Sequence, residues 1–245
     1  EFVERAMNGF NETNFAAWLI SLFGNAIADR TLKMYLVGRS RNDNGKATIF
    51  WQIDIDGKVR TGKIMCYTQM IGKRNKEINP YMVHPKTDFN CTLSFFGEHL
   101  LTEYPDKKVG IVESEKTAII ASIFMPDMVW LATGGSNGCK WREWAVFKVL
   151  AGRDVTLFPD FGYSNVKNKK TCFTEWSERA AAIRERMNCK IKVSRILEDA
   201  LTESDRAGQD LADFLIKTES PGGPAILNGY PAMWDLMSTQ LILNN

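Results

Sequence analysis

The chain has 245 residues, 44% of them hydrophobic, and a formal net charge of +2 at pH 7. This length is enough for one large domain or two modest ones, and the hydrophobic content excludes a disordered chain. No apolar run reaches about 18 residues, and the N-terminus lacks the basic start and apolar core of a secretion signal. We therefore expect a cytoplasmic protein that does not contact a membrane.

The cysteines and histidines argue against two kinds of site. The five cysteines are odd in number and widely spaced, without a C-x-x-C pair, and the chain has only two histidines. A disulfide framework and a zinc site are both disfavoured by this pattern. Free thiols in a reducing compartment are expected.

Charge is distributed unevenly along the chain. Residues 30–76 contain eleven Lys and Arg against three Asp, and residues 57–76 contain no acid. Residues 198–219 reverse this balance, with seven acids against two bases. The basic segment is the footprint expected of a surface that binds phosphates, although charge alone fits a solvated β-hairpin face equally well.

The N-terminal half is predicted to combine a helix with a small antiparallel sheet. Residues 11–24, "NETNFAAWLISLFG", place large apolar side chains at helical spacing and end at a glycine, which predicts an amphipathic helix. Segments rich in β-branched and aromatic residues follow over about residues 35–68 and predict the sheet. The Asp56-Gly57 step between two of them predicts a hairpin.

From Val109 onward, short apolar strands alternate with helices. Strands are predicted for "VGIVES", "MVWLATGG", "RDVTLFPD" and "KIKVSRIL", and helices for "EKTAIIASIF", "KWREWAVFKVLAG" and "FTEWSERAAAIRERMN". This alternation predicts a parallel sheet covered on both faces and connected by right-handed crossovers. The stretch "SPGGPAILNGYP" is typical of a linker, here to a short C-terminal helix, "AMWDLMSTQLIL".

Two acids follow predicted strands of this sheet. Glu113 lies at the end of the first predicted strand and Asp160 at the end of the third, and a glycine pair ends the second. Ligands bind at the carboxyl ends of parallel strands, and neighbouring strands lie about 4.8 Å apart. Glu113 and Asp160 can therefore share a divalent ion, and Mg²⁺ suits oxygen ligands completed by water and phosphate. Taken singly, Glu113 fits a helix start, although Glu115 fits it better, and Asp160 fits a turn.

Other phosphate and hydrolase motifs are absent. The glycine-rich "GGSNGCKW" precedes a predicted helix, but a cysteine separates its last glycine from the lysine, so the Walker pattern fails. No G-x-S-x-G sequence occurs, and two histidines leave little room for a hydrolytic triad. A Walker-type nucleotide triphosphatase is therefore disfavoured.

The motifs "VESEKTA", "LATGG" and "VTLFPDFG" resemble, in order, those of the Toprim domain, a catalytic fold shared by bacterial primases, topoisomerases and some nucleases. In this resemblance Glu113 holds the position of the invariant acid, and Asp160 is the first acid of the D-x-D strand. Gly162 stands where the family has the second acid. The resemblance implies an α/β fold with a Toprim-type parallel sheet flanked by helices. It also implies that Glu113 and Asp160 are catalytic and bind Mg²⁺ or Mn²⁺.

The flanking segments extend the resemblance. Residues 50–85, followed by "LSFFGEHLL", resemble the basic subdomain that precedes Toprim in bacterial-type primases and that holds template or incoming nucleotide. The implied nucleotide- or nucleic-acid-binding set is Arg60, Lys63, Lys73, Arg74, Lys116, Gly134 and Gly135. Downstream, "GQDLADFL" resembles a helix that follows Toprim domains in mobile-element primases, which makes Asp210 and Asp213 candidate further metal ligands.

The resemblance implies three parts. Residues 1–107 would form the N-terminal helix and a basic β-rich subdomain, residues 108–217 the Toprim domain, and residues 218–245 a linker and short helix. The expected function is primase-like nucleotidyl transfer on single-stranded DNA, with nucleotides as substrates and a helicase or another mobile-element replication protein as partner. An enzyme is preferred. A catalytically degenerate nucleic-acid-binding module, favoured by Gly162, and a Toprim nuclease stay open.

Overall fold

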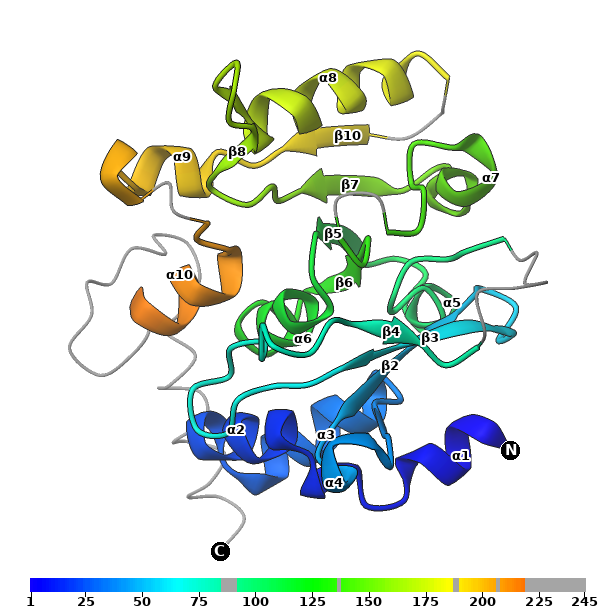
Figure 1. Cartoon of the computed structure of the whole chain (residues 1–245). Coiled ribbons are helices and arrows are strands. Elements are labelled where there is room, and N and C mark those ends of the chain that lie inside the picture. The colour runs from blue at the N-terminus through cyan, green and yellow to red at the C-terminus, as the bar shows by residue number, and fades with distance from the viewer. Residues whose placement is uncertain (85–91, 136–137, 187–189, 206–207, 219–245) are drawn as a thin grey trace, which may run out of the picture.

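The computed structural model of the chain describes residues 1–84, 92–135, 138–186, 190–205 and 208–218. It contains an antiparallel sheet from the N-terminal half and a parallel sheet from the rest, together with a short hairpin (Figure 1). The predicted α/β class, with a helix-flanked parallel sheet and a small antiparallel sheet before it in the chain, is confirmed. None of the described helices is both long and apolar enough to cross a membrane.

The N-terminal helices cover one side of the antiparallel sheet. They are α1 (Phe2–Met7), the 3-10 turn η1 (Phe10–Glu12), α2 (Asn14–Phe23) and α3 (Asn25–Met34). The predicted amphipathic helix is α2, which Thr13 caps by accepting a hydrogen bond from the Ala16 amide at 3.2 Å. Phe15, Trp18 and Leu19 form its buried face. Helix α3, which follows α2 directly, was not predicted from the sequence.

The antiparallel sheet has the order β1-β2-β3-β4. Its strands are β1 (Gly38–Arg39), β2 (Thr48–Ile53), β3 (Val59–Met65) and β4 (Tyr81–Met82), with the short helix α4 (Asn42–Gly45) between β1 and β2. The predicted hairpin joins β2 and β3, and Gly57 at its turn has a φ of 77°. Every residue of β2 is buried, so this strand is the centre of the N-terminal half.

The parallel sheet has the order β10-β7-β5-β6. Its strands are β5 (Lys108–Val112), β6 (Met128–Ala132), β7 (Asp154–Leu157) and β10 (Lys190–Val193). Helix α6 (Glu115–Phe124) follows β5 and lies on one face of the sheet (Figure 1). Helix α7 (Trp144–Phe147) follows β6, and α8 (Cys172–Arg184) precedes β10 and lies on the other face (Figure 1). All three strand pairings are parallel, as the alternation of strands and helices predicts.

One continuous core joins the two sheets. Phe96 pairs with Ala132 at the edge of β6, with both backbone hydrogen bonds 3.0 Å long. The ring of Phe96 also stacks on Tyr35, with ring centroids 5.1 Å apart. Helix α5 (Leu100–Glu103) leads from this contact into β5. The predicted boundary at residue 107 falls just after α5, and the division into domains stays a prediction.

Two segments differ from the predicted elements. The helix expected over residues 140–152 is only α7 followed by the 3-10 turn η2 (Lys148–Leu150). Lys140 has a φ of 55°, and Trp141 is buried against Trp176 with ring centroids 5.0 Å apart, so packing overrides helix propensity here. The segment after Asp160 forms an unpredicted hairpin, β8 (Tyr163–Asn165) and β9 (Lys170–Thr171).

The end of the described chain returns to the parallel sheet. Its elements are α9 (Ile196–Ala200), η3 (Glu203–Asp205) and α10 (Leu211–Thr218). Helix α10 packs on α6 (Figure 1). The predicted linker and C-terminal helix lie outside the described residues.

Candidate functional site at the carboxyl edge of the parallel sheet

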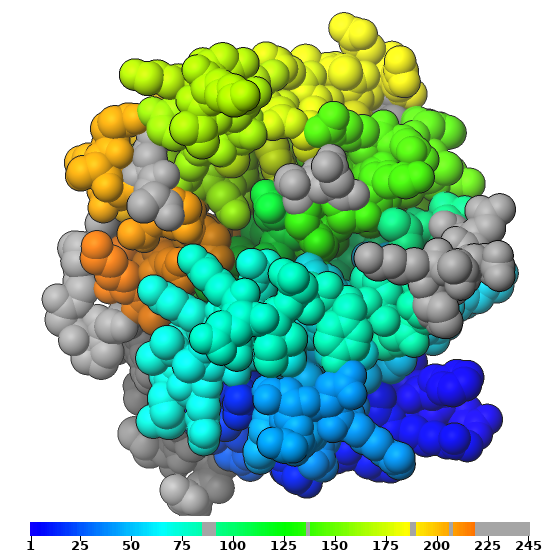
Figure 2. Space-filling model, in the orientation of Figure 1, coloured from blue at the N-terminus to red at the C-terminus, as the bar shows by residue number. Residues whose placement is uncertain are grey.

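Strands β5 and β7 are neighbours, and both end at the same edge of the sheet. The chain leaves β5 for α6 on one face and leaves β7 for α8 on the other (Figure 1). In open α/β sheets, ligands bind in the crevice between two such strands. Glu113 follows β5 directly, and Asp160 follows β7 after Phe158 and Pro159. The surface is hollowed between the yellow-green β8–β9 hairpin, the orange α10 and the cyan segment before residue 85 (Figure 2).

The sequence around Glu113 separates it from the helix that follows. The preceding Ile111 and Val112 are buried in β5. Ser114 caps α6, because its hydroxyl accepts a hydrogen bond from the Thr117 amide at 3.1 Å. Helix α6 therefore begins at Glu115, as expected, and Glu113 stays in the connection at the strand end.

The predicted glycine turn forms backbone hydrogen bonds with Glu113. The amides of Gly134 and Gly135 donate to the Glu113 carbonyl oxygen at 2.9 and 3.0 Å. Their φ angles are 81° and 124°, which glycine adopts readily. A Cβ atom on Gly134 would lie 3.2 Å from the Glu115 carboxylate, so a residue without a side chain fits best at this position. Both amides are engaged within the chain, and phosphate binding by these glycines stays a prediction.

Several acids share one environment at this edge. Burial raises the pKa of Asp160 well above its usual range, and the nearby Glu113 and Asp210 carboxylates raise it further. A backbone hydrogen bond of 2.8 Å from Phe161 to Gln209 brings the two acidic segments side by side. The predicted pair Glu113 and Asp160 is therefore close enough to interact, and Asp210 adds to the same field.

Lys116, Asp210 and Asp213 form an ion-pair cluster beside these acids. The Lys116 ammonium lies 3.1 Å from one carboxylate oxygen of each aspartate. Asp210 also caps α10 by accepting from the Asp213 amide at 2.8 Å, and it accepts from the Thr117 hydroxyl at 3.1 Å. The two aspartates thus tie α10 to α6, and their role as metal ligands stays a prediction.

The donor set for a divalent ion is small. Across the described part of the chain, no three His, Cys, Asp or Glu side chains come close enough together to hold a metal. The pair Glu113 and Asp160 suits Mg²⁺, which typically takes one or two carboxylates and completes its shell with water and phosphate. The crowding of like charges around Asp160 also fits a site that receives a cation.

Lys63, predicted to bind nucleotide, forms a buried ion pair instead of facing open solvent. Its ammonium donates to both oxygens of Glu115 at 3.1 and 3.0 Å and to the Gly134 carbonyl at 3.0 Å. Glu115 is only 2% exposed. This pair joins β3 to α6 and to the turn behind Glu113. Sequence reasoning missed it, because the partners are 52 residues apart.

The other predicted basic residues divide into two kinds. Arg60 binds the buried Asp54, with nitrogen–oxygen distances of 2.5 and 2.6 Å. Lys73 and Arg74 are exposed on the loop after β3, and neither forms an ion pair among the described residues. Nearby Tyr67 has its pKa raised by burial and then by Glu115 and Asp210, so this loop begins beside the acidic edge.

Two further acids were not predicted. Burial raises the pKa of Cys172 to about 11, and Asp160, Glu113 and then Glu198 add to the effect, which places Glu198 near the same edge. Glu98 is 2% exposed and accepts backbone hydrogen bonds from Ile55 at 3.1 Å and Phe95 at 3.0 Å. Its only sequence signal is an acid within the apolar "LSFFGEHLL" segment, which indicates a buried polar contact.

Comparison with known structures defines the class to which this architecture belongs. The E. coli primase catalytic core superposes with a TM-score of 0.56 at 10% identity, over 100% of this chain and 83% of that one. The RNA polymerase domain of Mycobacterium tuberculosis primase DnaG, in complex with double-stranded DNA, gives a TM-score of 0.50 at 9% identity, over 88% and 74%. The fold is that of a primase catalytic core.

The sequence itself falls in a more particular group. The chain belongs to the family described as a domain of unknown function, DUF6371, whose model matches residues 13–161. This match includes the antiparallel sheet and both strand ends that carry Glu113 and Asp160. None of the curated proteins that were compared with the chain matches it.

Proposed function

We propose that this chain is a primase-like Toprim protein that performs Mg²⁺-dependent nucleotidyl transfer on a single-stranded DNA template. One observation carries the proposal: Glu113 and Asp160 follow neighbouring strands at the switch point of a sheet whose fold is that of primase catalytic cores. A likeness in fold alone does not define an activity. The two acids at the ligand-binding edge supply the chemical argument.

Glu113 and Asp160 would hold the ion, Mg²⁺ or Mn²⁺. When bound, such an ion neutralises charge on the phosphoryl group that is transferred and favours ionisation of the attacking hydroxyl. The Gly134-Gly135 turn fixes the Glu113 backbone through two hydrogen bonds, so this carboxylate starts from a defined position. Lys116 is paired with Asp210 and Asp213 beside these acids, and it would exchange one of those carboxylates for the triphosphate.

The template strand would approach along the loop after β3. Lys73 and Arg74 are exposed there and can bind phosphates directly. Lys63 and Arg60 are engaged by Glu115 and Asp54, so their part in binding is to hold the sheet in place. We keep a helicase, or another replication protein of a mobile element, as a predicted partner.

A catalytically degenerate nucleic-acid-binding module is the second candidate. Gly162 replaces the second acid of the D-x-D strand, and the described residues contain no cluster of three metal-binding side chains. A binding module would keep the fold and the basic loop without the chemistry. The two candidates predict the same affinity for nucleic acid and differ in nucleotide incorporation.

An incorporation assay separates them. The native chain is incubated with labelled nucleotides, single-stranded DNA templates and Mg²⁺ or Mn²⁺, beside Glu113→Gln and the exposed control Glu103→Gln. We expect the native chain and the control to extend product, and Glu113→Gln to lose about 100-fold or more, equivalent to roughly 3 kcal/mol. Equal incorporation by native chain and Glu113→Gln would contradict the proposal. No incorporation by either, with DNA binding intact, favours the binding module.

A further inference from the structure

The β8–β9 hairpin projects from the acidic edge and carries a charge of the opposite sign. It begins three residues after Asp160 and returns the chain to α8. Residues 161–174 contain no Asp or Glu, but they contain Lys167, Lys169 and Lys170. The hairpin lies just beyond the family match, which ends at residue 161. It is therefore a basic element next to the candidate site.

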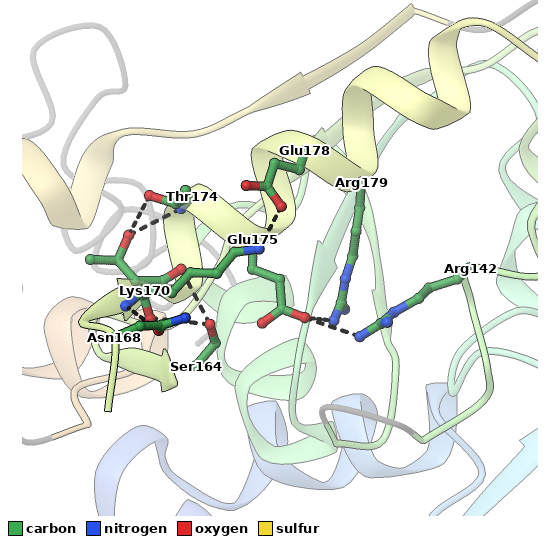
Figure 3. Close-up of polar contacts among 9 residues, drawn as sticks. Arg142, Ser164, Asn168, Lys170, Thr174, Glu175, Glu178 and Arg179 are labelled. Carbon is green, nitrogen blue, oxygen red and sulfur yellow. Dashed lines mark hydrogen bonds and ion pairs between the residues drawn. The ribbon is translucent and has the colours of Figure 1, made fainter. Parts of the chain in front are cut away.

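Side-chain hydrogen bonds shape the tip of this hairpin. Asn165 accepts from the Lys167 amide at 3.1 Å, and Asn168 accepts from the Lys170 amide at 3.1 Å. The Ser164 hydroxyl donates to the Lys170 carbonyl at 3.1 Å, across the hairpin (Figure 3). Such Asx turns hold a defined backbone at a loop tip. The lysines of the tip are therefore carried by a turn that side-chain hydrogen bonds stabilise.

The acids of α8 that face the hairpin are already paired. Lys170 reaches Glu178 at 2.5 Å, and Glu175 lies between Arg142 and Arg179, with ion pairs to both (Figure 3). Glu203, from η3, accepts a hydrogen bond from the Tyr163 hydroxyl near the base of the hairpin. In the described ranges, neither Lys167 nor Lys169 forms an ion pair, and both are exposed. Val166, beside them, is 75% exposed.

The base of the hairpin touches the acidic edge. The Cys172 amide donates to the Gly162 carbonyl at 2.9 Å, which closes the loop two residues from Asp160. The Cys172 side chain lies in the field of Asp160 and Glu113. A phosphodiester held at those two acids would thus lie beside the base of this hairpin.

We propose that the β8–β9 hairpin is a nucleic-acid-binding arm, in which Lys167 and Lys169 contact the phosphates of a strand that occupies the acidic edge. Val166 offers an apolar contact to a sugar or base of the same strand. The arm rests on the proposed function. It adds a second binding element, on the other side of the hollow in Figure 2 from the cyan segment before residue 85.

Binding of labelled oligonucleotides tests the arm. Fluorescence anisotropy is measured over a range of salt concentrations with a single strand and with a duplex of the same sequence. The full-length native chain is compared with Lys167→Glu/Lys169→Glu and with the milder Lys167→Gln/Lys169→Gln. The matched control, Lys108→Glu/Lys148→Glu, reverses two exposed lysines at the opposite end of the parallel sheet, with the same change in net charge.

We expect the hairpin charge reversal to weaken binding about tenfold at low salt, and the control to stay within about twofold. Losing two phosphate contacts should also reduce the log–log salt slope by about 1.4 for single strands. The Gln pair should change affinity in the same direction with an unchanged melting temperature. A loss confined to the single strand identifies the template as the ligand, and a loss confined to the duplex identifies the product.

Equal affinities for the hairpin and control variants would overturn the arm and leave the proposed function standing. A native chain that binds neither oligonucleotide would overturn both. Hairpin-dependent binding without nucleotide incorporation would support the arm and remove the enzymatic function.

Discussion

The two sheets differ in how their charged side chains are paired. In the antiparallel sheet bases are matched with buried acids, as in the bidentate contact of Lys63 with Glu115. At the edge of the parallel sheet, acids crowd together, and Asp160 lies in the field of Glu113 and Asp210. Matched buried pairs fix the arrangement of neighbouring elements, whereas crowded like charges cost stability and are typical of binding sites.

The basic segment, residues 30–76, presents less positive charge than its composition indicates. Its lysines and arginines suggest a positive surface, but Lys63 and Arg60 are neutralised by acids that the sequence places far away or on the same hairpin. Of the four bases predicted in this segment, Lys73 and Arg74 are exposed, and the β8–β9 hairpin adds exposed lysines outside it. Charge counts along a chain therefore overestimate the charge that a surface presents.

The largest expected effect comes from breaking the matched pair. Lys63→Met leaves the Glu115 carboxylate buried without its cation, and we expect the free energy of unfolding to fall by about 3–5 kcal/mol. Glu115→Gln should cost less, because Lys63 is 18% exposed and can reach water. Urea unfolding of both variants provides the measurement.

The double variant Lys63→Met/Glu115→Gln is the control for this prediction. It removes both charges, so it should recover part of the stability lost in Lys63→Met, with a positive coupling in the double-mutant cycle. Strictly additive losses would show that the two side chains do not form the pair described above.

Glu98 tests how buried acids without a cation behave. Burial raises its pKa to about 7, from a usual value of 4.5. The folded chain holds a proton on Glu98 that the unfolded chain releases between about pH 4.5 and 7, so stability should fall as pH rises through this window. The expected loss is about 3 kcal/mol. Glu98→Gln should lose this slope, whereas the exposed control Glu103→Gln should keep it, in urea unfolding from pH 5 to 8.

Asp160→Asn tests whether the crowded acids at the edge of the parallel sheet repel each other. Because the pKa of Asp160 is raised in the folded state, ionising it above that pKa costs stability, and a neutral amide removes the repulsion from Glu113 and Asp210. In metal-free buffer at pH 8 we expect Asp160→Asn to stabilise the chain by about 1 kcal/mol, typical of relieving an unfavourable charge at a functional site. A destabilised variant at pH 8 would mean that the acids do not repel each other.

Local signals predicted much of the fold. The Asp56-Gly57 turn and the helix start at Glu115 depend on a few neighbouring residues, and both form as expected. The convergence of Glu113 and Asp160 follows from sheet topology, because parallel strands end at a common edge. These features depend on short stretches or on general rules of strand order.

Tertiary pairing could not be predicted in the same way. Lys63 meets Glu115 only because the two sheets dock, and nothing near either residue specifies the other. The β8–β9 hairpin has strands of three and two residues, too short for an alternating pattern. The helix expected around Trp141 is replaced by a turn, because burial of that ring against Trp176 outweighs local propensity.

The most direct test of the account is metal binding at the carboxyl edge, read as a shift in melting temperature. At a Mg²⁺ concentration about 100 times its dissociation constant, the native chain should gain about 2.7 kcal/mol, or roughly 5–10 °C. Glu113→Gln should show almost none of this rise, and Glu103→Gln should show all of it. Equal rises in the native chain and Glu113→Gln would contradict a metal site formed by Glu113 and Asp160.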